Sequence, residues 1–232
     1  MKKLAFLLLG MFMASTAMAA APLALKTQDF QQLKVRGHLN VEYVSSADSA
    51  GLILISGSVE EYLSRVEASS SGRKLTLNLQ MSDVETTPAN LPSVRVYSSY
   101  LTKVENDGDS TVVVNSPAAG ARFSATVTGN GRISVRDIKA GEVKINVNAG
   151  HGIAAVSGDC NKAVFNVNGA GVVQADALRA TEADIWAAGT GNIGVWAVKN
   201  LKIKGLGSGT IFIKGTPHIT QKNFGLKIQM IE

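Results

Sequence analysis

The segment Gly129-Asn130-Gly131-Arg132-Ile133-Ser134-Val135 contains the motif that decides the fold, a Gly-X-Gly tripeptide followed by a short alternating run. The tripeptide recurs as Gly150-His151-Gly152, Gly169-Ala170-Gly171, Gly189-Thr190-Gly191 and Gly207-Ser208-Gly209, with first glycines 21, 19, 20 and 18 residues apart. Asp107-Gly108-Asp109 lies where a preceding copy would fall. Five copies at a nearly constant spacing indicate an internal structural repeat.

Alternating apolar and polar residues flank the tripeptides, as in Phe165-Asn166-Val167-Asn168 and Ile193-Gly194-Val195. Period-two alternation predicts strands with one buried face. Tight hairpins would not repeat at this longer spacing, whereas a coil that returns above its own start would, with successive coils pairing in parallel at about 4.8 Å. The sequence therefore predicts an all-β fold, a parallel β-helix (solenoid) with coils of about 20 residues.

Glycine suits the corners of such coils because it accepts positive φ and lets successive turns stack closely. We expect some of Gly131, Gly171 and Gly191 to need φ > 0. The repeat also predicts that Val127, Val147 and their equivalents point into a continuous core.

The chain divides into a leader and one domain. Residues 1–19 are typical of a secretory signal peptide, since Lys2 and Lys3 precede a short apolar run and Ala17-Met18-Ala19 offers a cleavage site. Residues 20–232 are expected to form one domain, with irregular opening coils over 20–105, regular repeats over 106–217 and a C-terminal cap over 218–232.

The opening coils are expected to be less regular than the repeats. Strands are predicted over 30–44, 51–57, 74–80 and 94–98, with a single helical turn within 59–67. Breaks are expected at Ser69-Ser70-Ser71-Gly72 and at Thr87-Pro88, because these residue types favour turns.

Composition excludes several function classes. Removal of the leader leaves 21 basic and 18 acidic residues, a net charge of +3 without a basic block, so nucleic-acid binding has little support. No segment of the mature chain is long and apolar enough to span a membrane. Cys160 is the only cysteine, and we expect it to be a buried, inert thiol because no paired base lies nearby.

The chain resembles the putative auto-transporter adhesin head domain family, also called the GIN domain. The resemblance rests on Phe30-Gln31-Gln32-Leu33-Lys34-Val35-Arg36-Gly37 through Val41-Glu42-Tyr43-Val44, on Lys74-Leu75-Thr76-Leu77, and on the Gly-X-Gly series. It covers roughly residues 25 to 217. It implies a binding role in the bacterial envelope and no catalytic residues.

Three aspartates could form a catalytic or Ca²⁺-binding column. Asp137, Asp159 and Asp176 each follow a corner, and stacked carboxylates could act as acid and base on a polysaccharide. A basic residue, Lys139, Lys162 or Arg179, follows each one, so a solvated ladder of opposite charges explains the same pattern.

The histidines give no sign of a metal site. His38, His151 and His218 fall in different coils and lack ligand spacing. No cofactor or metal is expected.

The outward residues of the regular coils form the candidate ligand-binding surface. One predicted column contains Thr126, Asn146, Asn166 and Trp186, and its neighbour contains Thr128, Asn148 and Asn168. A register slip at Ala149 would separate these residues. Trp196 and Phe212 are also expected to face outward. The same columns could simply stabilise stacked strands.

The sequence thus favours an exported, non-catalytic envelope or surface binding module that recognises a glycan or another envelope component. Its expected location is the periplasm or cell surface of a Gram-negative bacterium. A carbohydrate-active β-helix enzyme and a purely structural envelope protein stay as alternatives.

Overall fold

A computed structural model describes residues 22–57, 60–79, 91–148 and 150–232. The predicted leader, the Thr87-Pro88 break and Ala149 lie outside the described residues. Within the described ranges the chain contains one short helix and seventeen strands. They are β1 Leu23–Lys26, β2 Gln32–Arg36, β3 Asn40–Ser45, β4 Leu52–Ser56, α1 Glu60–Ser64, β5 Val66–Ser71, β6 Lys74–Leu79, β7 Ser93–Ser98, β8 Lys103–Asn106, β9 Thr111–Asn115, β10 Gly120–Thr128, β11 Arg132–Asn148, β12 Ile153–Gly169, β13 Val172–Gly189, β14 Asn192–Gly207, β15 Thr210–Lys214, β16 His218–Phe224 and β17 Lys227–Ile231.

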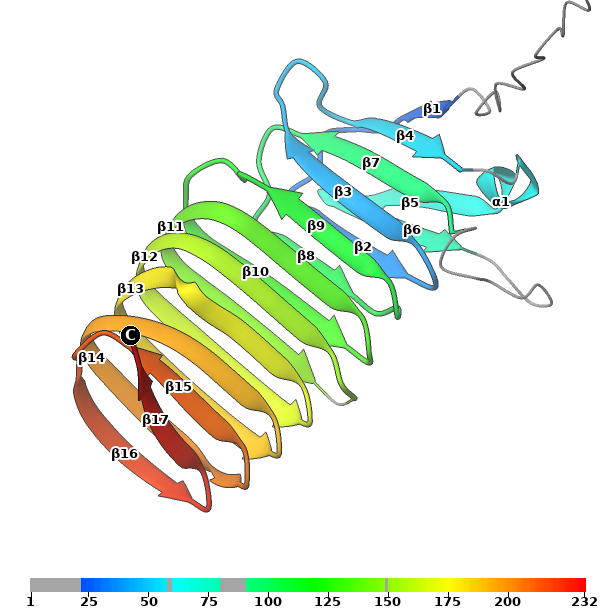
Figure 1. The fold of residues 1–232 in the computed structure, drawn as a ribbon. Coiled ribbons are helices and arrows are strands. Elements are labelled where there is room, and N and C mark those ends of the chain that lie inside the picture. Colours follow the sequence, from blue (N-terminus) through cyan, green and yellow to red (C-terminus); the bar gives the residue numbers. More distant parts are fainter. Residues whose placement is uncertain (1–21, 58–59, 80–90, 149) are drawn as a thin grey trace, which may run out of the picture.

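The strands wind into a parallel β-solenoid, which confirms the predicted fold class (Figure 1). Each of the long strands β11 to β14 bends midway and so contributes to both faces of the coil stack. Face 1 contains β7, β3, β9, the first halves of β11–β14, β15 and β17. Face 2 contains β6, β2, β8, β10, the second halves of β11–β14, and β16.

The core runs through the stack as columns of aligned apolar side chains. Val127, Val147, Val167 and Ala187 occupy matching positions in neighbouring coils, and all four are buried. The predicted inward direction of these residues is therefore confirmed. Because every coil buries its inward residues against the coils on both sides, neighbouring coils stabilise one another.

The corner glycines serve two different physical needs. The first glycine of each tripeptide has positive φ, for example +104° at Gly129. The second glycine is needed for space, because a Cβ at Gly191 would lie 2.2 Å from the carbonyl oxygen of Gly171. The expectation of positive φ at Gly131, Gly171 and Gly191 is wrong. In each tripeptide the residue with positive φ is the first glycine, two positions earlier.

The opening coils depart from sequential stacking. The β2–β3 coil is flanked on one side by β6 and β7 and on the other by β8 and β9. After β3 the chain thus forms the β6–β7 coil on one side of β2–β3, and then continues on the other side with β8–β9. Antiparallel strands cover this end of the stack, since β4 pairs with β7, β1 with β4, and β5 with β6.

Two local predictions can be compared with the ends of the stack. The break expected at Ser69-Ser70-Ser71-Gly72 is shorter than predicted, because β5 continues to Ser71 and only the turn that begins at Gly72 joins it to β6. The tail after Pro217, predicted as a C-terminal cap, forms the last coil of the stack. In this coil β16 pairs in parallel with β14 and β17 with β15, because its alternating pattern matches that of the preceding coils.

Candidate functional site

The predicted polar residues line up along face 2. Thr126, Asn146, Asn166 and Trp186 are consecutive partners in the parallel register. Thr128, Asn148 and Asn168 occupy the adjacent positions two residues further on. The possible register slip does not separate these residues, because Asn146 pairs with Asn166 and Asn148 with Asn168. The structure therefore brings all seven residues onto one surface, here called the polar ladder.

Hydrogen bonds link the ladder amides from coil to coil. The side-chain amide of Asn146 donates to the Thr126 hydroxyl at 3.2 Å, and Asn166 donates to the Asn146 oxygen at 2.9 Å. Asn168 donates to the Asn148 oxygen at 3.4 Å. Since an amide has two donor hydrogens and an oxygen with two lone pairs, Asn146 keeps one donor and one acceptor position for another group.

Trp186 ends the polar part of the ladder. Its side chain is 42% exposed, and its next neighbours in the column are Lys204 and Lys222. The second indole has a different setting: Trp196 lies on face 1, half-buried, with the Lys214 ammonium 5.0 Å from its ring centroid. Phe212 on β15 is also half-buried. Trp186 is thus the more accessible indole.

Toward the opposite end, the same column contains the charged residues Glu105 and Lys34. The Lys34 ammonium lies 3.4 Å from Glu105 and 2.9 Å from Asp107, and Lys103 also pairs with Glu105. Burial works to raise the Glu105 pKa, but the two ammoniums together hold it below its ordinary value. The hydrogen bond from Lys34 lowers the Asp107 pKa. The carboxylates of Glu105 and Asp107 are therefore both paired with lysine ammoniums.

The three aspartates do not form a column. Asp159 is paired in register with Lys139 on one side and Arg179 on the other, so opposite charges alternate there. Asp137 has φ of +55° at the bend of β11, and its backbone N–H donates to the Ser157 hydroxyl at 3.2 Å. The alternative of stacked carboxylates is therefore not realised, because the bends of successive coils contain bulges that shift the register. Around Asp159 the structure shows the alternating charges that the sequence favoured.

Cys160 and the three histidines do not come together in one site either. Burial raises the pKa of Cys160 to about 12, and the Asp159 carboxylate adds to the shift. His38 lies 3.7 Å from Asp109, His151 occupies a corner, and His218 begins β16. Over the described part of the chain, no cluster of three or more His, Cys, Asp or Glu residues could hold a metal.

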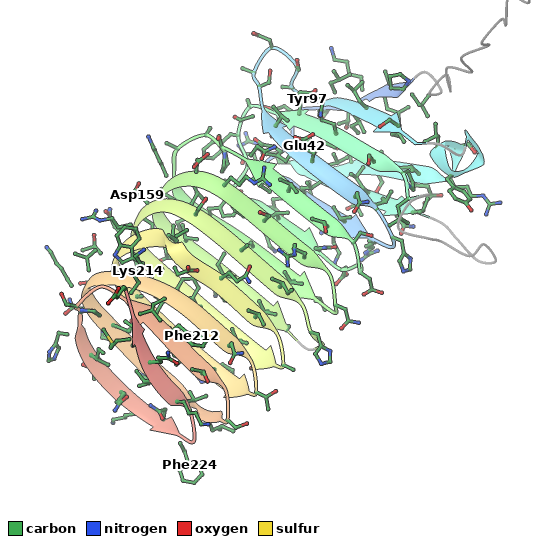
Figure 2. The ribbon with its side chains drawn as sticks, viewed as in Figure 1. Glu42, Tyr97, Asp159, Phe212, Lys214 and Phe224 are labelled. Carbon is green, nitrogen blue, oxygen red and sulfur yellow. The ribbon has the colours of Figure 1, made fainter. Side chains whose placement is uncertain are left out.

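A groove on face 1 is a feature that the sequence did not reveal. It has a volume of about 650 Å³ and is lined by β3, β4, β7, β9 and the bend of β11. Glu42 lies in it (Figure 2) and accepts hydrogen bonds from Arg95 at 2.7 Å and from Asn115 at 2.8 Å. Its apolar wall includes Leu54 and Val113. These strands are distant in sequence, so only their stacking order creates the groove.

No helix in the described ranges is long and apolar enough to cross a membrane. Together, the stacked coils and their exposed columns define the chain as a β-solenoid domain. Residues 29–217 match the family described as putative auto-transporter adhesin, head GIN domain, and the chain belongs to this family.

Solved structures of similar fold come from Bacteroides and Parabacteroides species. A putative adhesin from Bacteroides fragilis NCTC 9343 is 19% identical, with a TM-score of 0.81 over 90% of this chain and 96% of that one. A putative adhesin from Parabacteroides merdae ATCC 43184 is 20% identical, with a TM-score of 0.66 over 91% and 96% of the two chains.

A putative lipid binding protein from Parabacteroides distasonis ATCC 8503 is also 20% identical, with a TM-score of 0.67 over 92% and 98%. At these identities the likeness shows a shared fold alone. No curated protein matches the chain.

Proposed function

We propose that this protein is an exported, non-catalytic binding module of the cell envelope, in the periplasm or at the cell surface, and that it recognises an extended polar chain such as a glycan. The observation that carries the proposal is the unbroken register of Thr126, Asn146, Asn166 and Trp186 across neighbouring coils. Membership of an adhesin head family supports a binding role.

The polar ladder offers the groups that such a ligand needs. Its amides and hydroxyls repeat at the strand spacing of about 4.8 Å, and each Asn retains hydrogen-bonding capacity beyond the ladder itself. Trp186 supplies an exposed apolar ring on which a sugar ring can stack, and Trp residues contribute strongly to binding energy. The remaining ladder residues, Thr128, Asn148 and Asn168, widen the surface to two columns.

The two alternatives have less support. A glycosidase of the common type uses a pair of carboxyl groups facing one bond, whereas Asp159 stands between Lys139 and Arg179. A purely structural envelope protein would account for the ladder as strand stabilisation, but not for an exposed indole at its end.

The proposal is tested with processed protein and a panel of purified bacterial polysaccharides by isothermal titration calorimetry, a readout that does not depend on either indole. Trp186→Ala is expected to weaken binding of any polysaccharide recognised by the wild type by tenfold or more, since aromatic anchors often contribute above 1.4 kcal/mol. Trp196→Ala is the matched control, because that indole lies on the other face beneath Lys214.

Two results would contradict the polar ladder as the site. One is a polysaccharide that binds Trp186→Ala as tightly as the wild type. The other is binding that is lost on Val113→Ser, because Val113 lines the groove of face 1.

A further inference from the structure

The last two coils of face 2 combine unpaired lysines with protruding apolar side chains. Lys204 and Lys222 continue the Trp186 column. Leu206 and Phe224 continue the adjacent column, which contains Asn168 and Ala188 in the preceding coils. These four residues, Lys204, Leu206, Lys222 and Phe224, are called the terminal patch.

The apolar members of the terminal patch are unusually exposed. Leu206 is 62% and Phe224 84% exposed, and Figure 2 shows Phe224 pointing away from the ribbon at the turn between β16 and β17. They are register partners in neighbouring strands, so their side chains lie about one strand spacing, ~4.8 Å, apart. Scattered surface apolar residues are ordinary, but adjacent ones next to charges mark an interaction surface.

The charge of the terminal patch is uncompensated. Both of its lysines are exposed, and within the described residues neither one forms an ion pair with a carboxylate. Lys34, at the opposite end of the same column, instead pairs with Glu105 and Asp107. In the column that contains Trp186, Lys34 in the first coils is thus ion-paired, whereas Lys204 and Lys222 in the last coils, among the described residues, are not. The partner that complements the terminal patch is therefore anionic.

The shape of the terminal patch favours a deformable partner. Phe224 is the last residue of β16, next to the left-handed Gly225 of the turn to β17. Because its ring is almost fully exposed, a rigid partner would need a matching pocket to bury it. The headgroup region of a bilayer accepts aromatic and aliphatic side chains without one, while lysine ammoniums contact the lipid phosphates. Lysine stems cover apolar surface at the same time.

We propose that the terminal patch docks the solenoid onto an anionic phospholipid surface, with Phe224 and Leu206 inserted at the headgroup level and Lys204 and Lys222 against phosphates. The proposal does not rest on polysaccharide recognition by the polar ladder. Lys204 is the register neighbour of Trp186, so the two sites are separated with Phe224→Ala, which lies further along the stack. This variant is expected to leave polysaccharide binding unchanged, and failure of either proposal leaves the other intact.

The test is sedimentation of the processed protein with vesicles. We expect binding to vesicles of phosphatidylglycerol mixed with phosphatidylcholine, and weak or no binding to phosphatidylcholine alone. Because a lysine near an anionic surface contributes about a fivefold gain in partitioning, Lys204→Gln with Lys222→Gln is expected to reduce binding about 25-fold. Phe224→Ala is expected to weaken it further. Added salt is expected to weaken binding of the wild type.

A control variant carries the same changes at the opposite end of the solenoid. Lys26→Gln, Lys74→Gln and Leu23→Ala alter two lysines and one exposed apolar residue on β6 and β1, and vesicle binding is expected to stay at the wild-type level. Since Phe224 is 84% exposed, its removal leaves the fold intact, which circular dichroism verifies.

Three results would overturn the proposal. The first is equal binding to neutral and anionic vesicles, and the second is equal loss in the control and patch variants. The third is the absence of vesicle binding, including the case in which a soluble anionic polysaccharide binds the terminal patch instead.

Discussion

Replacing Gly191 by Ala tests the stacking of the corners directly. The added Cβ would lie 2.2 Å from the Gly171 carbonyl oxygen and 2.9 Å from a methyl group of Val167, whereas ordinary contacts begin near 3.4 Å. The two coils must therefore separate locally by about an ångström. Because φ at Gly191 is not in the left-handed region, the effect is purely steric.

The expected cost follows from what that separation disrupts. The Gly191 N–H donates to the Gly169 carbonyl at 3.1 Å, and a further ångström breaks such a bond. Losing about two backbone hydrogen bonds at ~1 kcal/mol each, together with ~1–3 kcal/mol of overpacking, gives roughly 3–5 kcal/mol. For a chain of this size that loss lowers Tm by roughly 6–20 °C.

The assay is urea and thermal unfolding, followed by circular dichroism, of Gly191→Ala and two reference variants. Gly129→Ala isolates the backbone term, because φ is +104° there and the nearest atom is 3.9 Å from the new Cβ; ~1–2 kcal/mol is expected. Gly72→Asn is the neutral control, since its turn has φ of +57° and open space. If Gly191→Ala is as stable as Gly72→Asn, the account of the corners is incorrect.

Two further outcomes follow from the buried thiol and from the aspartates. Cys160 is expected to resist alkylation in the folded protein near neutral pH and to react after unfolding, since burial raises its pKa to about 12. In the unfolded chain the thiol has an ordinary pKa of about 8.5 and therefore loses its proton at lower pH than in the folded protein. The contribution of the Cys160 thiol to stability is thus complete below that pH and is lost as pH rises toward 12. A Cys160→Ala variant that shows the same alkaline destabilisation would contradict this. Replacing Asp137, Asp159 and Asp176 together by Asn is expected to remove no polysaccharide-cleaving activity, and cleavage by the wild type that disappears in this variant would favour an enzyme.

The regular part of the fold could be predicted because its information is local. Each repeat contains a Gly-X-Gly corner and an alternating run, so the period and the buried face of residues such as Val147 and Val167 follow from spacing. The polar ladder follows as well, since a constant period aligns Asn146 with Asn166. The role of each corner glycine could not be predicted from the sequence, because φ at Gly129 and the space beside Gly191 depend on the neighbouring coil.

By itself, the sequence determined that the chain is a parallel solenoid and which side chains point outward. Only the tertiary structure decided which strands are neighbours at the irregular end. A period-two pattern specifies a buried face, but every strand offers the same backbone N–H and C=O groups to any partner, so the placement of β2–β3 between β6–β7 and β8–β9 is not encoded locally. The groove around Glu42 depends on that order. The terminal patch has the same origin, because Lys204 meets Lys222, and Leu206 meets Phe224, only when the tail forms one more coil.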